Sequence, residues 1–342
     1  MKRPKAVILG AGALGLGFLA ERTASHYDLC LADLGPKEDL LRHIETDQGF
    51  TVNICSLEGV YPKQVAGRFR VSLTDTPRGR YELDQALNEA DLVFTATGKR
   101  LLDNVVLITA PAMNRRAKKG WLLFCENGRH IAAGYAHSFG PQVVLVDTVM
   151  SRMCRFSDPL EGKYEPLWPG YDRALVVEDH SFLPLSTDLC RSGPFGPMFS
   201  LVSHAEFQLW EDIKLYLHNG MHAFVSYHAF LEGAELFSDT SYHIRHEAGQ
   251  VILEELVPAI VRTHSGARKE EIEGYGLGLL ERFFNPFFGD TIERGVRGVA
   301  DKLAPDERLV GGCEYIKRAG IEPRGYATTI QAAEEILARQ KR

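Results

Sequence analysis

Short apolar runs alternate with segments of helical periodicity along the first half of the chain. Helices are predicted at residues 101–119, where Pro111 kinks the helix or starts a second piece, and at residues 131–136. The apolar runs predict buried strands at residues 6–9, 29–33, 90–95, 121–125 and 143–146. Such alternation is typical of the α/β class, with a parallel, doubly wound sheet of Rossmann type. In these sheets the ligand lies beyond the carboxyl ends of the strands.

The pattern changes after residue 157. From Ser203 onward helical periodicity dominates and few strand signals remain; helices are predicted at residues 205–217, 243–264, 269–284 and 328–340. The preceding segment, 157–200, is broken too often for a regular helix, although residues 174–178 could form a short strand. The residues that break it are Pro159, Pro166, Pro169, Pro184, Gly193, Pro194, Gly196 and Pro197.

These patterns predict two domains. Residues 1–200 should form a dinucleotide-binding domain that includes an irregular joining segment, and residues 201–342 a mainly helical substrate and catalytic domain. A chain of 342 residues is long enough for two hydrophobic cores. The last helix should begin at Thr328, because Thr328 and Gln331 resemble a capping box, and Pro258 should kink the helix at 243–264.

Composition narrows the classes of partner. Hydrophobic residues make up 45% of the chain and charged residues 25%, as in soluble globular proteins. The net charge of -6 gives no reason to expect a nucleic-acid partner, and no apolar stretch is long enough for a membrane span. The six cysteines form no CxxC pair, which favours reduced thiols and a cytoplasmic location. The oligomeric state is not indicated.

A glycine-rich motif follows the first predicted strand. Gly10, Gly12 and Gly15 form GxGxxG between a strand and a helix, the setting in which backbone N–H groups approach a pyrophosphate. Asp33 ends the second strand, 18 residues after Gly15, where a carboxylate would bind the adenosine ribose. No arginine follows Asp33 directly, although Lys37 is near, so NAD is favoured over NADP. A tight turn and a surface aspartate without a nucleotide are the alternative.

Three polar residues stand at or just beyond the ends of later strands. Thr97 and Asn127 are candidates for binding the cofactor, because the carboxyl ends of parallel strands meet at one edge of the sheet. Asp147 is a candidate catalytic residue that could orient a lysine or bind a substrate hydroxyl. Its alternative role is a cap at the end of its strand.

Residues 214–222 place an amine, a carboxamide and imidazoles on one predicted helix. At about 100° per residue, His218, His222 and Asn219 lie roughly 40°, 80° and 140° from Lys214, on one side of the helix. Lys214 is a candidate general acid/base for oxidising a secondary alcohol, if burial and nearby positive charge lower its pKa. Asn219 and His222 could donate hydrogen bonds to the carbonyl oxygen. A solvated lysine beside two structural histidines is the alternative.

These motifs together resemble the polyol-specific long-chain dehydrogenases over nearly the whole chain. The resemblance includes the glycine motif and Asp33, Lys-x4-Asn-x2-His at Lys214–His222, and the segments 125–127, 147–152 and 282–290 with Arg294 downstream. It implies hydride transfer between a nicotinamide cofactor and a sugar alcohol or ketose, without a metal. His218 stands where an apolar residue is expected in this family, and its role is open.

The resemblance also implies a substrate that can carry a phosphate. Arg294, Arg297 and Lys302 lie beyond the Asn285-Pro segment, and guanidinium groups suit phosphate oxygens. A solvated basic face is the alternative. Two other functions stay open at this stage: a glycerol-3-phosphate or 3-hydroxyacid type of dehydrogenase, and an NAD-binding sensor without catalysis. A zinc enzyme is disfavoured, since the scattered cysteines supply no recognisable ligand set.

Overall fold

A computed structural model of the chain describes residues 3–157 and 162–340, and Pro159 lies outside the described residues. The chain divides into two compact units, Met1–His204 and Ala205–Arg342. No helix among the described residues combines the length and hydropathy of a membrane span. The two units are described separately.

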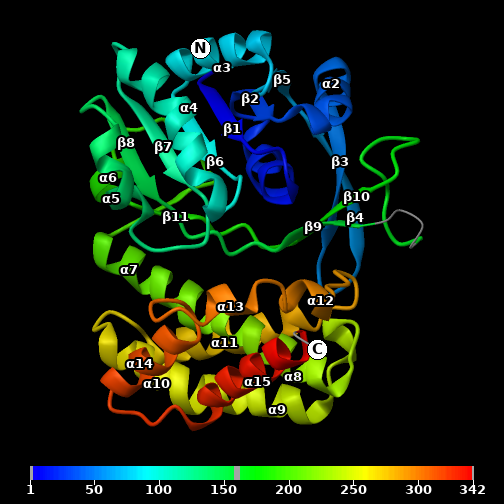
Figure 1. Ribbon diagram of the computed structural model, residues 1–342, viewed down its shortest axis with the longest axis vertical. Helices are drawn as coiled ribbons and strands as arrows, with labels where there is room; N and C mark the ends of the chain where they lie inside the picture. Colours follow the sequence, from blue (N-terminus) through cyan, green and yellow to red (C-terminus); the bar gives the residue numbers. More distant parts are fainter. Residues whose placement is uncertain (1–2, 158–161, 341–342) are drawn as a thin grey trace. The chain divides into compact units, whose positions relative to one another are not determined.

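The first unit contains a six-stranded, fully parallel sheet in the order β5-β2-β1-β6-β7-β8 (Figure 1). Side chains alternate between its two faces: Ile8 packs into one core and Val7 into the other. The Rossmann-type sheet predicted from the sequence is confirmed. Its strands are β1 (Lys5–Leu9), β2 (Asp28–Asp33), β5 (Arg68–Leu73), β6 (Leu92–Thr95), β7 (Gly120–Phe124) and β8 (Val143–Asp147).

Helices cover both faces of this sheet. The two longest, α3 and α4, contribute to the core that contains Val7, and the segments after β1 and β2 contribute to the core that contains Ile8. Pro111 lies inside α4 without splitting it. The elements are η1 (Gly15–Ala20), α1 (Glu21–Thr23), η2 (Gly35–Lys37), α2 (Glu38–Asp47), α3 (Pro77–Glu89), η3 (Lys99–Leu101), α4 (Leu102–Arg115), α5 (Ile131–Tyr135) and η4 (Ala136–Ser138).

A second sheet, of four strands in the order β4-β3-β10-β9, was not predicted. The strand expected at 174–178 is confirmed as its β10, but the joining segment is more regular than expected. Besides β10 it contains strand β11 and the short helix α6, and strands β9 and β12 lie at its two ends. The bounds are β3 (Gly49–Cys55), β4 (Val60–Ala66), β9 (Cys154–Ser157), β10 (Ala174–Glu178), β11 (Pro184–Ser186), α6 (Thr187–Cys190) and β12 (Ser200–Val202).

A buried ion pair ties the chain between β8 and β9 to the helix that follows the glycine motif. The guanidinium of Arg152 donates to the Glu21 carboxylate over 2.6 Å, with both side chains at most 2% exposed. Arg152 also donates to the carbonyl oxygen of Gly17, within the π-helical segment η1. A Cβ on Gly17 would lie 2.6 Å from Val177, so the helix and β10 approach each other closely only because residue 17 is glycine.

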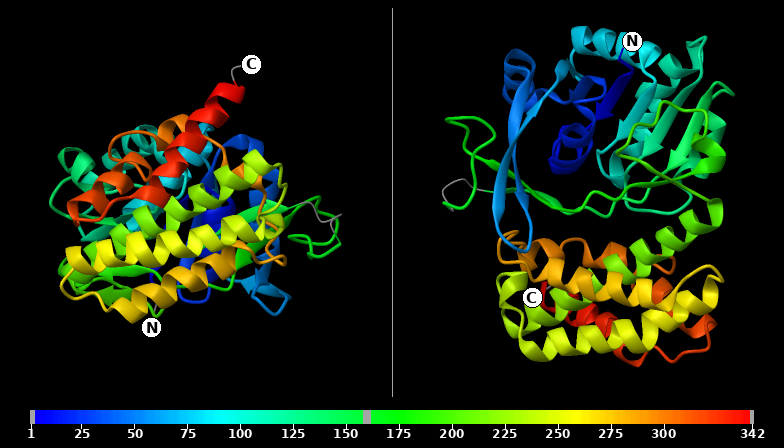
Figure 2. Two further views of the ribbon diagram at one scale, coloured as in Figure 1. Left: turned by 90° about the horizontal axis from the view of Figure 1, so that it is seen from below. Right: turned by 180° about the vertical axis from the view of Figure 1, so that it is seen from behind.

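The second unit is built from helices, which can be followed from α7 to α15 in Figures 1 and 2. Its central helix α8 packs against α9, α12 and α15. The helices are α7 (His204–Asp212), η6 (Ile213–Asn219), α8 (Gly220–Glu232), η7 (Phe237–Asp239), α9 (Tyr242–Val251), η8 (Ile252–Leu256), α10 (Val257–Thr263), α11 (Lys269–Phe283), α12 (Ile292–Gly295), α13 (Val299–Lys302), α14 (Val310–Arg318) and α15 (Arg324–Gln340).

The last helix begins earlier than predicted. It starts at Arg324 rather than Thr328, because the Glu255 carboxylate accepts hydrogen bonds from the N–H groups of Gly325 and Tyr326. A carboxylate from a distant helix therefore caps α15, in place of the local capping box. The helix predicted at 243–264 is present as α9, η8 and α10, with a π-helical segment just before Pro258.

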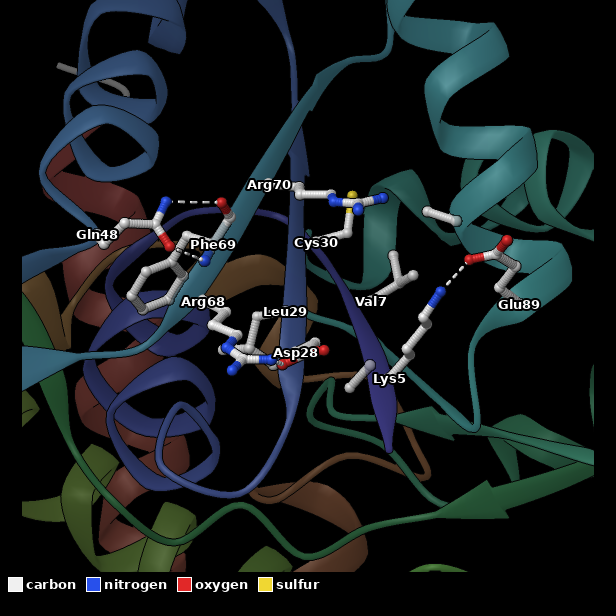
Figure 3. A pocket seen from close by; sticks show the side chains of 12 residues that line it. Lys5, Val7, Asp28, Leu29, Cys30, Gln48, Arg68, Phe69, Arg70 and Glu89 are labelled. Atoms are coloured by element: carbon white, nitrogen blue, oxygen red, sulfur yellow. Dashed lines mark hydrogen bonds and ion pairs between the residues drawn. The ribbon is translucent and has the colours of Figure 1, made fainter. Parts of the chain in front are cut away.

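A charged pocket of about 340 Å³ lies at the amino ends of β1, β2 and β5 (Figure 3). Lys5 pairs there with Glu89, and Arg68 with Asp28, so most of its charge is compensated. Ligands of doubly wound sheets bind at the opposite, carboxyl ends of the strands. This pocket is therefore not the candidate nucleotide site.

Candidate functional site

The three glycines of the motif are required for different reasons. Gly10 has a φ of +102°, and a Cβ there would lie 2.5 Å from the Ala96 carbonyl oxygen. A Cβ on Gly15 would lie 1.9 Å from the Gly10 carbonyl oxygen. At Gly12, apart from its neighbours in the chain, the only atom of the described residues within 4 Å of a Cβ would be Nζ of Lys37, at 4.0 Å. The surface over Gly12 is therefore open, and a phosphate could approach the backbone there.

Asp33 fastens this loop to the end of β2. Its Oδ2 accepts hydrogen bonds from Ala11 N and Lys37 Nζ, both at 2.7 Å, and its Oδ1 accepts one from Leu34 N at 2.8 Å. An ionised carboxylate has about four acceptor positions, so one is left for a ribose hydroxyl. The ammonium group of Lys37 also compensates the charge of Asp33, which the sequence pattern alone did not indicate.

An apolar pocket of about 150 Å³ adjoins Asp33. Leu34, Leu101 and Ile108 line it and are 45–50% exposed, unusually open for large apolar side chains. Thr97 also lines it, and its hydroxyl oxygen has no hydrogen-bond partner among the described residues. A narrow apolar slot with a carboxylate and an unsatisfied hydroxyl at its edge fits the adenosine half of a dinucleotide.

Glu126, just beyond the carboxyl end of β7, is a residue of this site that was not predicted from the sequence. It is buried, and its carboxylate accepts hydrogen bonds from the Thr95 hydroxyl at 2.5 Å and from Thr97 N at 3.0 Å. It therefore fixes the loop that carries Thr97. An acid directly after the strand that ends near residue 125 was the available signal. Asn127, beside it, is exposed.

Asp147 is engaged within the first unit. Its Oδ1 accepts a hydrogen bond from Ala132 N at 2.9 Å, at the start of α5. Burial raises the pKa of Asp147, although the hydrogen bonds from the α5 backbone act in the opposite direction. This geometry supports the capping role that the sequence left as the alternative.

The candidate residues Lys214, Asn219 and His222 lie on one continuous helical run of the second unit, from α7 through η6 to α8. Lys214 and Asn219 both fall in η6, which is π-helical rather than α-helical. A π-helix bonds residue i to i+5, so residues five apart lie nearly above one another. Lys214 and Asn219 are five apart, and the wider turn brings them closer together than the α-helical spacing predicted. Single π turns within α-helices are frequent at functional sites.

Tyr326 of α15 stabilises this wider turn. Its hydroxyl is fully buried between two carbonyl oxygens, that of Arg308 at 2.5 Å and that of Tyr216, within η6, at 3.2 Å, and it shares its one proton between them. A Cβ on Gly220 would lie 2.0 Å from that hydroxyl oxygen, so glycine is required where α8 begins. The π segment is thus held by a contact from another helix.

The polar side chains of η6 differ in burial and contacts. His218 is 2% exposed, bonds to the Tyr275 hydroxyl at 3.2 Å and packs edge-on against Phe283, which indicates a structural role. Asn219 is 8% exposed, and its carboxamide has no hydrogen-bond partner among the described residues. Lys214 is half-buried. Asn219 therefore offers an unused donor close to Lys214.

His222 contacts a carboxylate that was not among the predicted site residues. Its Nε2 lies 3.4 Å from Oδ2 of Asp290, and Asp290 in turn receives a two-point contact from the Arg294 guanidinium. Burial lowers the pKa of His222 to about 4, although Asp290 acts in the opposite direction. Burial opposes ionisation of Asp290, but Arg294 and His222 outweigh it and hold the Asp290 pKa below its usual range.

The three predicted substrate-binding cations are not equivalent. Lys302 is largely enclosed and donates to the Gly295 carbonyl oxygen at 2.7 Å; burial, with help from the charges of Arg308 and Arg294, lowers its pKa to about 8. Arg297 is exposed and pairs with Glu293. Helix α12 ends at Gly295, so Arg294 and Arg297 do not lie on one helix.

Comparisons with known proteins agree with the resemblance seen in the motifs. Residues 206–334 match the family of the mannitol dehydrogenase C-terminal domain. The chain is 26% identical to a mannitol-1-phosphate 5-dehydrogenase of Exiguobacterium sibiricum, over 96% of this chain and 84% of the relative. It is 27% identical to the mannitol-1-phosphate 5-dehydrogenase of Bacillus subtilis, over 96% of this chain and 86% of that relative.

Solved structures show the same fold. A D-sorbitol dehydrogenase in substrate-free form has a TM-score of 0.75 at 16% identity, over 98% of this chain and 80% of that one. A second structure is the ternary complex of Pseudomonas fluorescens mannitol 2-dehydrogenase with NAD and D-mannitol. It has a TM-score of 0.68 at 13% identity, over 97% of this chain and 78% of that one. At this identity the likeness concerns the fold alone.

Proposed function

We propose that this chain, whose resemblance to the polyol-specific long-chain dehydrogenases is confirmed by the family match and the relatives, is an NAD-dependent oxidoreductase. It transfers a hydride between nicotinamide and a polyol or polyol phosphate, of the mannitol 1-phosphate/fructose 6-phosphate type, without a metal. One observation carries the proposal: Lys214 shares a π-helical turn inside the matched domain with Asn219, whose carboxamide has no hydrogen-bond partner among the described residues.

The residues of the first unit fit NAD. The open surface over Gly12 admits the pyrophosphate, Asp33 retains an acceptor position for the ribose, and the apolar pocket beside Thr97 suits the adenine. Asn127 is exposed near the carboxyl end of β7 and is a candidate contact for the nicotinamide half. The nicotinamide ring supplies the hydride acceptor for alcohol oxidation.

Proton transfer is assigned to Lys214. Oxidation of a secondary alcohol requires a base that takes the hydroxyl proton as the hydride leaves, and ketose reduction requires the same group as an acid. The neutral amine of Lys214 accepts that proton, and its ammonium form returns it. Asn219 donates its amide N–H to the substrate oxygen, where negative charge develops. His222, one turn further along the helix, contacts the substrate beside it.

A phosphate group on the substrate would be held by Arg294 and Lys302. Lys302 is enclosed, and its charge and that of Arg294 act on each other, so an anion between them would relieve mutual repulsion. Arg297, exposed and paired with Glu293, can add only a weaker, screened attraction. We therefore rank Arg294 and Lys302 above Arg297 as phosphate ligands.

A substrate panel tests the proposal as a whole. Polyols, polyol phosphates, glycerol 3-phosphate and 3-hydroxyacids are assayed with NAD and with NADP through the absorbance of the reduced nicotinamide. Turnover of polyols or their phosphates with NAD supports the proposal. NAD binding without turnover of any polyol would identify a sensor, and turnover confined to glycerol 3-phosphate or 3-hydroxyacids would identify the other dehydrogenase class.

Asp33→Ala should reduce the preference of the enzyme for NAD over NADP. The substitution removes the ribose acceptor and leaves Lys37 without its carboxylate partner, so an adenosine 2′-phosphate would meet an uncompensated ammonium group. We expect kcat/KM with NAD to fall about tenfold or more, while kcat/KM with NADP falls less or rises. Steady-state kinetics with both cofactors measure this ratio, and an unchanged ratio would contradict the role given to Asp33.

The affinity for a phosphorylated substrate should depend on the protonation of Lys302. Its amine is charged below its pKa of about 8, and the phosphate is doubly ionised above about pH 6. The KM for the polyol phosphate should therefore rise as the pH increases through about 8, whereas the KM for the free polyol should not. Lys302→Met should flatten this dependence. Equal pH profiles for the two substrates would argue against a phosphate site at Lys302.

A further inference from the structure

We propose that Asp290 is a positioning residue that fixes His222 as the tautomer protonated on Nε2, so that the imidazole meets the substrate as an acceptor through Nδ1. The inference rests on the proposed function only for its kinetic consequence. The tautomer itself is a property of the protein without substrate, and it can be measured without turnover.

The contact between the two side chains sets the tautomer. Oδ2 of Asp290 lies 3.4 Å from Nε2 of His222, and the Asp290 side chain is 1% exposed. An ionised carboxylate only accepts hydrogen bonds, so the ring nitrogen that faces it must carry the proton. The charge of Arg294 keeps Asp290 ionised, because it outweighs the effect of burial. The neutral ring then has its lone pair on Nδ1.

Two aromatic rings limit how far the imidazole can turn. The ring centroid of Phe237 lies 4.6 Å from that of His222, and the centroid of Phe283 lies 5.1 Å away with the rings nearly perpendicular. Both phenylalanines are 1% exposed and therefore fixed by the surrounding core. A flip that exchanged Nε2 and Nδ1 would have to displace one of them, so the rings reinforce the tautomer that Asp290 selects.

Asp290 is itself held at three points. Nε of Arg294 donates to Oδ1 at 2.6 Å, and Nη2 of Arg294 contacts Oδ2. The Asp290 carbonyl oxygen accepts a hydrogen bond from Phe237 N at 3.0 Å. The same Phe237 thus packs against the imidazole and bonds to the backbone of Asp290. Contacts fixed in this way orient a histidine better than a single surface ion pair does.

The arrangement changes the role expected for His222. A neutral imidazole whose Nε2–H donates a hydrogen bond to Asp290 has no second N–H to donate to a carbonyl oxygen. The doubly protonated ring could donate, but at neutral pH it is scarcely populated, because burial lowers the His222 pKa to about 4. Asn219 is then the donor to the reacting oxygen, and Nδ1 of His222 accepts a hydrogen bond from a substrate hydroxyl.

Nitrogen NMR tests the tautomer directly. The enzyme is labelled with ¹⁵N-histidine, and the His222 signals among its 12 histidines are assigned by their loss in His222→Gln. We expect a proton on Nε2 and a bare Nδ1 in the substrate-free enzyme throughout the neutral pH range. A proton on Nδ1, or a doubly protonated ring at pH 6, would overturn the proposal even if the enzyme oxidises polyols.

A double-mutant cycle tests whether Asp290 acts through His222. Asp290→Asn keeps the shape of the side chain and should lower kcat/KM for the polyol on the order of 10–100-fold, the range found for carboxylates that orient histidine ligands. With His222→Ala also present, Asp290→Asn should have little further effect. Effects that multiply independently would show that Asp290 acts by another route and would overturn the proposal.

Two controls separate positioning from stability. Asp306→Asn makes the same chemical change at an exposed position and should leave kcat/KM and the His222 signals unchanged. The imidazole of Asp290→Asn should lose its exclusive Nε2 protonation, which a merely structural role would not cause. If Asp290→Asn does not fold, the tautomer of the unsubstituted enzyme still decides the proposal.

Discussion

Lys214→Ala should slow turnover by roughly 10²–10⁴-fold while NAD binding stays near normal, because the substitution removes the proton-transfer group and leaves the glycine loop intact. Turnover is measured with saturating NAD and substrate, and NAD binding by fluorescence titration. Lys317→Ala is the matched control, since Lys317 is an exposed lysine paired with Glu314. The control should change stability by less than about 0.5 kcal/mol and leave turnover unchanged.

The pH profile gives a second test of Lys214. Alcohol oxidation needs the neutral amine and should rise as pH passes the apparent pKa of the proton-transfer group, while ketose reduction should fall over the same range. His222, with a pKa of about 4, should not contribute near neutral pH, but Lys302, with a pKa of about 8, can. The profile is therefore measured in Lys302→Met as well. A folded, NAD-saturated Lys214→Ala enzyme with full activity would falsify the assignment.

Alanine substitutions at Gly12 and Gly15 should differ in their effect on stability. At Gly15 the new Cβ would lie 1.9 Å from a backbone oxygen, so the loop must shift, and we expect destabilisation by about 1–3 kcal/mol or more. At Gly12 the nearest described atom beyond its neighbours in the chain would be 4.0 Å away, so the fold should be kept. That Cβ would instead occupy the space assigned to the pyrophosphate.

Gly12→Ala should therefore weaken NAD by at least about tenfold without lowering the melting temperature. Gly134→Ala is a suitable control, because a Cβ on this glycine would meet no atom within 4 Å and it lies outside the glycine motif. Thermal unfolding and NAD titration are measured on all three variants. Normal NAD affinity in Gly12→Ala would contradict the nucleotide site described here.

The sequence by itself determined the features that depend on neighbouring residues. The apolar run at 29–33 predicts β2, observed as Asp28–Asp33, because burial on both faces requires consecutive apolar side chains. The glycine motif could be recognised from the sequence because its turn and helix follow β1 directly. The Lys214, Asn219 and His222 set lies within one helical run, so its spacing alone brought the three residues into one hypothesis.

Tertiary structure decided whatever depends on a distant partner. Strands β3 and β10 stabilise each other through pairs such as Asn53 with Val176, and a local pattern does not record such a pairing. The π turn that draws Lys214 toward Asn219 is contacted by the Tyr326 hydroxyl of α15, and α15 begins where Glu255 caps it. Asp290 reaches His222 from 68 residues away. A hydrogen bond requires a partner within about 3 Å, and only the packed chain brings such groups together.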